Sequence, residues 1–253
     1  MKLFHRVMGD GPPLLILHGL FGSSDNWQTH ARVLANSHTV YLIDQRNHGH
    51  SPHSDEMNYD VMSHDLFELI AEYGLRDVRL IGHSMGGKTI MRFAQQYGFL
   101  IDRMIVADMG VKQYPSHHEE VFKGLFAVDV ANCPSRREAE NRIAKHVSEQ
   151  STLQFLLKNL YWKEQGVLAW RFNLGVIFRD RLNLMAALPQ ERFETPALFL
   201  TGGRSQYVPD SDHAAIRQLA VHSQFECMEN AGHWLHAEFP EDFVNRCLHY
   251  FNS

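Results

Sequence analysis

Residues 80–87 read Leu-Ile-Gly-His-Ser-Met-Gly-Gly, a short apolar run that ends in the pattern G-x-S-x-G. This pattern is typical of a sharp turn between a strand and a helix, on which the serine hydroxyl stands clear of the sheet edge. Gly82 and Gly86 flank Ser84, and residues without side chains let the backbone fold back without collision. We therefore expect Ser84 to be a nucleophile. The alternative is a glycine-rich turn whose serine only caps the next helix.

On both sides of this turn, strand-like apolar runs alternate with segments whose apolar residues recur three and four positions apart. Such alternation predicts a parallel sheet, and the unbroken apolar runs indicate strands covered by helices on both faces. The expected strands are residues 14–17, 40–43, 78–81, 104–107, 197–201 and 225–228, and the expected helices include residues 26–34, 59–73, 213–221 and 240–251.

The alternation stops after Asp108. Residues 110–188 look almost entirely helical, and we expect no strand there. One of these helices should cover residues 135–147, beginning at the cap residue Ser135 with Glu138 three positions on. The sequence thus predicts a core domain of residues 1–110 and 189–253, with a helical cap of residues 111–188 inserted into it.

Two further segments could complete a hydrolytic site around Ser84. The run His-Gly-Leu-Phe-Gly at residues 18–22 follows the first apolar strand. Its loop can aim the N–H of Leu20 at a reacting carbonyl oxygen, with the N–H of Met85 as the second oxyanion donor. Near the C-terminus, residues 230–234 read Asn-Ala-Gly-His-Trp between the last strand and the last helix. His233 in that loop can act as the general base, in the chain order serine, acid, histidine.

These motifs together resemble the α/β-hydrolases and, within them, the YbfF-like esterases. The resemblance covers essentially the whole chain and lies in HGLFGS at 18–23, DQRNHGHS at 44–51, GHSMGGK at 82–88 and AGHWLHAE at 231–238. It implies an α/β-hydrolase fold, with a mostly parallel eight-stranded sheet under a helical cap. It also implies hydrolysis of carboxylic esters or thioesters, including acyl-CoA, without a cofactor.

The acid that orients the histidine is not obvious from the residues. Many members of the wider superfamily carry it after the strand at 197–201, where this chain has Ser205, which lacks the charge. Asp210 and Asp212 lie further on, where a carboxylate serves well as a helix N-cap. Asp108 directly follows the strand at 104–107, at the same expected sheet edge, and could instead cap a loop. The YbfF-like resemblance also points to Asp108, which we therefore predict to be the acid.

Other residues receive weaker predictions. Asp44 is most simply structural, accepting backbone N–H groups in a buried turn. Aromatic and polar side chains of the cap could line the acyl site, although packing of the cap is favoured because aromatic residues in helices are more often core. The predicted substrate-binding residues are Phe21, Trp162, Trp170, Arg171, Phe172, Tyr207 and Trp234.

Composition excludes several classes of function. A net charge of -5 disfavours nucleic acid, and the run at 14–17 is too short for a membrane span. Three cysteines without CxxC spacing suggest neither disulfides nor zinc, which favours the reducing cytoplasm. The histidines are scattered and never form HExxH, so we expect no metal site.

We therefore predict a serine hydrolase that cleaves small-molecule esters or thioesters through a covalent acyl-serine. Two alternatives stay open. One keeps the fold but hydrolyses carbon–carbon bonds or eliminates a group, and the other is a ligand-binding homologue without turnover. Acyl length, leaving group and oligomeric state cannot be inferred from these patterns.

Overall fold

A seven-stranded sheet forms the centre of the protein in a computed structural model that describes residues 1–116 and 118–253. The strand order is β1-β3-β2-β4-β5-β8-β9, and all neighbours are parallel except β1 and β3. The expected eighth strand is not found among the described residues, because the segment ahead of β1 does not form another strand. The strands are β1 His5–Met8, β2 Pro13–Leu17, β3 Thr39–Ile43, β4 Val78–His83, β5 Ile101–Ala107, β8 Ala197–Gly202 and β9 Ser223–Met228.

Helices cover both faces of this sheet, so the central strands are buried on both sides as their apolar runs predicted. One face packs against α2 Tyr59–Glu72, α3 Met85–Tyr97 and α9 His213–Leu219. The other face packs against α1 Gln28–Leu34, α10 Leu235–Glu238 and α11 Pro240–Asn252. Short 3-10 turns at Ser24–Trp27, Gly98–Leu100 and Asp210–Asp212 complete the layers.

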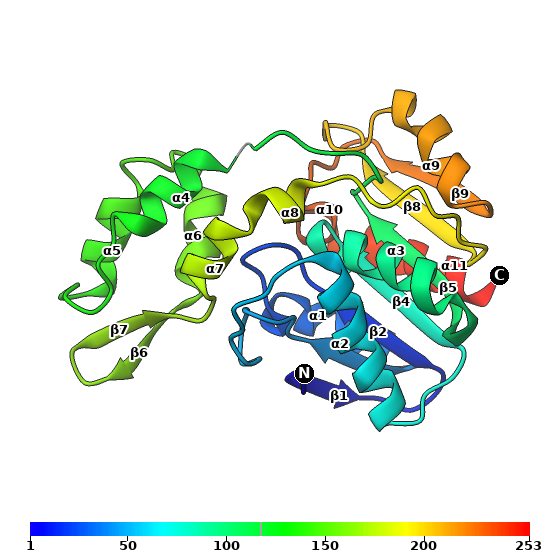
Figure 1. The fold of residues 1–253 in the computed structure, drawn as a ribbon, viewed down its shortest axis with the longest axis horizontal. Coiled ribbons are helices and arrows are strands. Elements are labelled where there is room, and N and C mark those ends of the chain that lie inside the picture. The colour runs from blue at the N-terminus through cyan, green and yellow to red at the C-terminus, as the bar shows by residue number, and fades with distance from the viewer. Residues whose placement is uncertain (117) are drawn as a thin grey trace.

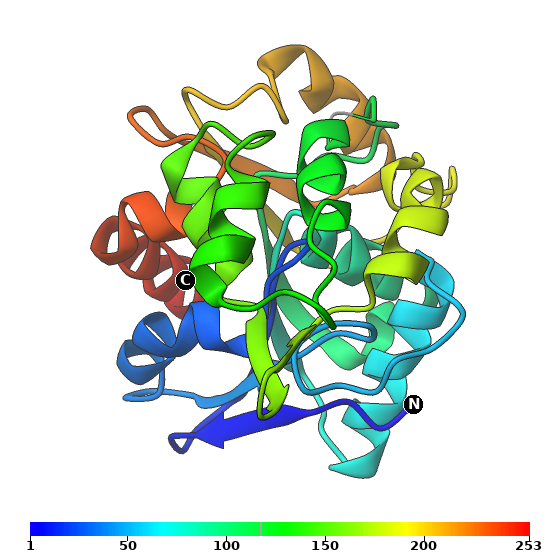
Figure 2. The same ribbon diagram turned by 90° about the vertical axis from the view of Figure 1, so that its left-hand side faces the viewer.

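The remaining elements, which we call the cap, lie beside the sheet; all but α8 are grouped on the left of Figure 1, and this side faces the viewer in Figure 2. The cap helix α5 begins after Ser135, whose side chain accepts the N–H of Glu138 at 3.1 Å, as predicted. The expectation of a purely helical cap is wrong, because two antiparallel strands form a hairpin that turns at Gly166, where φ is +81°. The cap elements are α4 Glu119–Phe126, α5 Arg136–Ile143, α6 Gln150–Leu157, β6 Leu160–Glu164, β7 Val167–Trp170, α7 Leu174–Arg179 and α8 Arg181–Met185.

The two segments that join cap and sheet run side by side. The N–H of Leu188 donates to the carbonyl of Val111 at 2.9 Å, and the N–H of Tyr114 donates to that of Met185 at 2.8 Å. These bonds support our proposal that residues 111–188 form a cap inserted into a core of residues 1–110 and 189–253. Within the described residues, no helix has both the length and the apolar character needed to span a bilayer.

Candidate active site

Ser84 occupies a strained turn between β4 and α3. Its φ of 53° and ψ of -115° are unusual for a residue with a side chain, and such strain is characteristic of functional turns. The turn is very tight, because a Cβ on Gly82 would lie 2.4 Å from the carbonyl oxygen of Gly86. A Cβ on Gly86 would lie 2.4 Å from the oxygen of Leu17. Glycine is therefore required on both sides of Ser84.

Asp108 directly follows β5 and lies against His233. Its side chain is fully buried, and Oδ2 accepts a hydrogen bond from His233 Nδ1 at 2.7 Å. The same carboxylate accepts the hydroxyl of Ser205 and the N–H of Gly202, the latter at 3.1 Å. Donation from Nδ1 leaves Nε2 of His233 as the nitrogen that can accept a proton. Ser205, which stands where the resemblance to the wider superfamily implies an acid, thus donates to the acid instead.

The two rival acids lie elsewhere. The Asp210 side chain is fully exposed, and its carboxylate is 3.8 Å from His213. Asp212 forms an ion pair with Lys112 at 2.5 Å, at the entrance to the cap. Asp212 occupies the N-cap position of α9 and Asp210 begins the 3-10 turn before it, but neither carboxylate makes the predicted N-cap hydrogen bond.

Ser84 and His233 line the same cavity. Among residues 1–116 and 118–253, no hydrogen bond joins the Ser84 hydroxyl to the imidazole. Such bonds are often long before substrate binds and tighten in the reacting complex.

The two predicted oxyanion amides are available, that of Leu20 in the loop after β2 and that of Met85 at the start of α3. A tight turn closes this loop, with the N–H of Gly22 donating to the oxygen of Gly19 at 2.9 Å. Phe21 has a φ of 59°, and its N–H donates to His48 Nε2 at 3.1 Å. The N–H groups of Leu20 and Met85 enter no hydrogen bond within the described part of the chain. Met85 also opens α3, where the unpaired amides favour negative charge.

Two neutral histidines hold this loop, a role that the sequence did not reveal. His18 Nε2 accepts the N–H of Gln45 at 3.0 Å, and Gln45 Nε2 donates to the His18 carbonyl at 2.6 Å. Burial lowers the pKa of His18 and lowers the pKa of His48 to about 3. Both rings must be neutral, because each accepts a backbone N–H. The first histidine of DQRNHGHS, His48, was the available signal for this role.

Asp44 fixes the start of the same segment and is structural, as predicted. Its carboxylate accepts the N–H of Ser24 at 2.6 Å and that of His50 at 2.8 Å. Gly49 passes directly over it with a φ of +58°, and a Cβ there would lie 2.2 Å from Oδ2 of Asp44.

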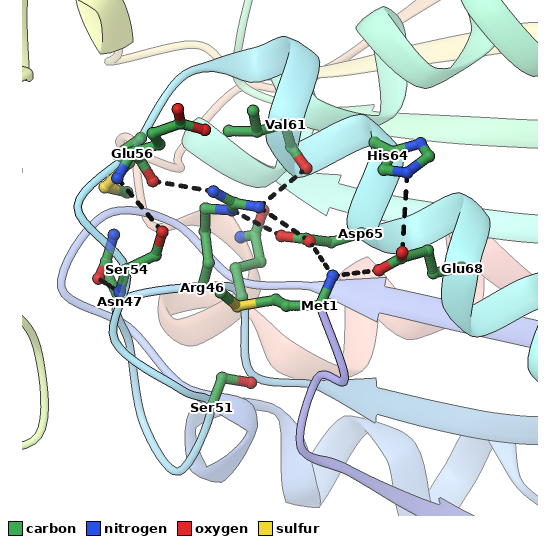
Figure 3. A network of polar contacts seen from close by, with 12 residues as sticks. Met1, Arg46, Asn47, Ser51, Ser54, Glu56, Val61, His64, Asp65 and Glu68 are labelled. Atoms are coloured by element: carbon green, nitrogen blue, oxygen red, sulfur yellow. Dashed lines mark hydrogen bonds and ion pairs between the residues drawn. The ribbon is translucent and has the colours of Figure 1, made fainter.

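A buried ion pair ties this segment to α2 (Figure 3). The guanidinium of Arg46 donates to both oxygens of Asp65, at 2.6 and 2.9 Å, and to the carbonyl of Glu56 at 2.9 Å. The amino group of Met1 reaches the same carboxylate at 2.7 Å. The bidentate pairing fixes the position of the segment that carries Gln45 and His48.

His83, the residue directly before the nucleophile, supports the loop that carries His233. Its Nε2 donates to the carbonyl of His233 at 2.9 Å, and the two rings are 4.8 Å apart. Burial and the neighbouring His233 lower the pKa of His83 to about 3, so it is neutral. On the other side of the base, Tyr207 stacks on the His233 ring with centroids 3.7 Å apart.

Three of the predicted substrate-binding residues line the space around Ser84. Phe21 and Trp234 line a cavity of about 430 Å³, and Tyr207 lines a second cavity of about 20 Å³. The four predicted cap residues line neither of these two cavities. Trp170 and Phe172 stack on each other in the core of the cap, Trp162 is half exposed on β6, and Arg171 covers the ring of Tyr161.

Metal ligands were not expected, and the described residues contain no group of three or more His, Cys, Asp or Glu side chains placed to hold a metal ion.

A family model described as "alpha/beta hydrolase fold" matches residues 12–160, which is more than half of the chain. The protein therefore belongs to the α/β-hydrolase family.

Individual relatives match nearly the whole chain. It is 38% identical to "sn-1-specific diacylglycerol lipase ABHD11" of Xenopus laevis, covering 96% of this chain and 80% of that protein. It is 33% identical to "Esterase YbfF" of Escherichia coli (strain K12), covering 95% and 93%. A solved structure of a "Marine microorganism esterase" superimposes with a TM-score of 0.95 at 38% identity, covering 98% of both chains. The predicted fold, the YbfF-like resemblance and the class of a carboxylesterase-type hydrolase are confirmed.

Proposed function

We propose that Ser84, His233 and Asp108 hydrolyse carboxylic esters through a covalent acyl-serine. The observation that carries the proposal is the 2.7 Å bond between His233 Nδ1 and the buried Asp108, in a cavity that also contains Ser84. This arrangement supplies the three groups that acyl transfer to a serine needs, namely a nucleophile, a general base and a negative charge that orients the base. The relatives named as esterases and lipase support ester bonds as the target.

The first half of the reaction breaks the ester bond. Ser84 Oγ attacks the carbonyl carbon while His233 Nε2 takes its proton. The N–H groups of Leu20 and Met85 hold the oxyanion, and each donor in such a site typically lowers the barrier by about 3 kcal/mol. The imidazolium, stabilised by Asp108, then gives its proton to the departing alkoxide, which leaves as the alcohol.

The second half releases the acid. His233 takes a proton from water, the resulting hydroxide attacks the acyl carbon, and Ser84 leaves with that proton restored. Thioesters such as acyl-CoA follow the same path with a thiol as the leaving group, and we include them in the proposal.

Two proposals concern the setting of the enzyme. Its partner is a small ester or thioester molecule and not nucleic acid, in keeping with the net charge of -5. Cys133, Cys227 and Cys247 are all free thiols, which supports a reducing compartment such as the cytoplasm.

A serine replacement tests the function directly. Ser84→Ala should abolish hydrolysis of p-nitrophenyl acetate and labelling by a fluorophosphonate, with thermal unfolding close to wild type. Ser37→Ala, on an exposed turn far from the site, is the control and should keep both activities. Labelling of another serine in the Ser84 variant, or undiminished turnover, would refute the assignment. Labelling of the wild type without turnover of any ester or acyl-CoA would favour a ligand-binding role.

A further inference from the structure

The nucleophile stands between two cavities of very different size. One has a volume of about 430 Å³ and the other about 20 Å³, and both include Ser84 and Leu20 in their walls. His233 lines only the larger cavity, whereas Met85 lines only the smaller one. The two cavities therefore meet at Ser84: the larger reaches the His233 imidazole, and the smaller extends to the start of helix α3 and to Tyr207, which stacks on the face of the His233 ring.

The chemistry decides which half of a substrate occupies each side. The leaving oxygen must receive its proton from His233, so the leaving group must lie on the side of the imidazole. The carbonyl oxygen points to the amides of Leu20 and Met85. The acyl chain is the remaining substituent, and the smaller cavity is the space left for it.

We propose that the smaller cavity binds the acyl chain and the larger cavity binds the leaving group, so that this enzyme cleaves short-chain acyl esters of bulky alcohols. The inference rests on the proposed function and adds the substrate class to it.

The smaller cavity is short because its aromatic walls are held in place. The hydroxyl of Tyr59 donates to the carbonyl of Leu184 at 2.8 Å, and that of Tyr114 donates to the carbonyl of Tyr207 at 2.9 Å. A volume of about 20 Å³ holds little more than one group the size of water. The wall of the smaller cavity can rearrange around a longer acyl chain most readily at methionines such as Met185, because their unbranched side chains are flexible.

The larger cavity suits an alcohol with an apolar body and a polar far end. Its volume lies within the usual range of small-molecule sites. Trp234 and Phe155, whose rings are 5.1 Å apart, form an aromatic wall next to His233. Polar side chains also line this cavity, namely Asp25, Asn26, Thr29, Ser151, Gln154 and Lys158.

A series of p-nitrophenyl esters tests the acyl side, because the leaving group stays constant. We expect kcat/KM for the octanoyl ester to be at least about 100-fold below that for the acetyl ester, since a pocket that excludes even one methylene discriminates by about 10- to 200-fold. Acetates of alcohols that differ in size but have similar acidity test the other side, and 1-naphthylmethyl acetate should be cleaved at least as well as methyl acetate.

Two variants then change one cavity at a time. Met185→Ala lengthens the smaller cavity and should move the preferred acyl chain to butanoyl or hexanoyl, while Met185→Leu, which keeps the volume, should not. Val121→Phe narrows the larger cavity and should lower kcat/KM for 1-naphthylmethyl acetate by at least about tenfold relative to methyl acetate.

The outcomes separate the inference from the proposed function. The assignment of the cavities is overturned if the wild type cleaves octanoyl and acetyl esters equally well. It is also overturned if Val121→Phe changes the ranking of acyl chain lengths while Met185→Ala does not. Absence of any Ser84-dependent ester cleavage overturns the proposed function, and the inference with it.

Discussion

Replacing Asp108 by Asn removes a charge at a position with three hydrogen-bond donors. Its carboxylate accepts from His233, Ser205 and the N–H of Gly202. An amide can serve these donors in two orientations. If its NH2 group faces His233, this group lies against the donors of His233 and Ser205. The imidazole must then accept at Nδ1 and carry its proton on Nε2, which is the wrong tautomer for a base. If the group is flipped, it opposes only the Gly202 N–H, but the charge that stabilises the imidazolium is still lost.

Both effects have expected sizes. Loss of a triad acid by this change lowers kcat by about 10⁴-fold in a well-studied protease, and that ratio corresponds to about 5.4 kcal/mol in the barrier. The flipped amide also leaves the buried Gly202 N–H without an acceptor, which should lower the free energy of unfolding by about 1–3 kcal/mol. The measurements are kcat for p-nitrophenyl acetate and urea unfolding at neutral pH.

Matched variants make the test decisive. Asp210→Asn and Asp212→Asn should change kcat by less than about threefold, because neither carboxylate reaches His233. The double variant Asp108→Asn with Ser205→Asp returns a carboxylate to hydrogen-bonding distance of the same point, and should recover at least about tenfold in kcat, or 1.4 kcal/mol. The reasoning is refuted if Asp108→Asn keeps near-normal kcat while Asp210→Asn or Asp212→Asn loses it without unfolding.

Two further predictions concern stability. Burial lowers the pKa of His48 from 6.5 to about 3. As the pH falls from 6.5 toward 3, the unfolded chain therefore takes up a proton at this residue while the folded chain does not. The neutral ring thus contributes its full stability above pH 6.5, and this contribution is lost as the pH falls. His48→Gln should therefore reduce the slope of unfolding free energy between about pH 6 and 4 by up to about 1.4 kcal/mol per pH unit in urea titrations, and an unchanged slope would contradict this account. Lys88 is fully buried and donates to the carbonyls of Lys112 and Ala186, at the two ends of the cap. Lys88→Met should cost about 2 kcal/mol in thermal unfolding because two carbonyls lose their donor, whereas the exposed control Lys123→Met should cost almost nothing; equal stability of both variants would exclude this role.

Some features could be predicted from the sequence because they depend only on residues that are close together in the chain. The turn at Ser84 needs only the glycines at 82 and 86 and a strand and helix on either side. The N-cap at Ser135 likewise involves a partner three residues away. The hairpin β6–β7 was missed although it is also local, because its strands are short and lie within an otherwise helical block.

The choice of acid depended on tertiary structure. The residues alone left Asp108, Asp210 and Asp212 as candidates, and only the family resemblance favoured the first. The bond from His233 to Asp108 joins residues 125 positions apart, and the one from Gly202 spans 94. Such contacts arise only when β5 and β8 pair and their following loops meet at one edge, which no local pattern describes.

The sequence by itself determined the elbow and the alternating core, since short-range sterics and apolar periodicity specify these features. The packing of the fold decided which cap aromatics stay in the interior of the cap, such as Trp170 and Phe172, and which rings reach the cavities. It also decided that His18, His48 and His83 are neutral, because burial among distant segments removes the water that would stabilise their charged forms.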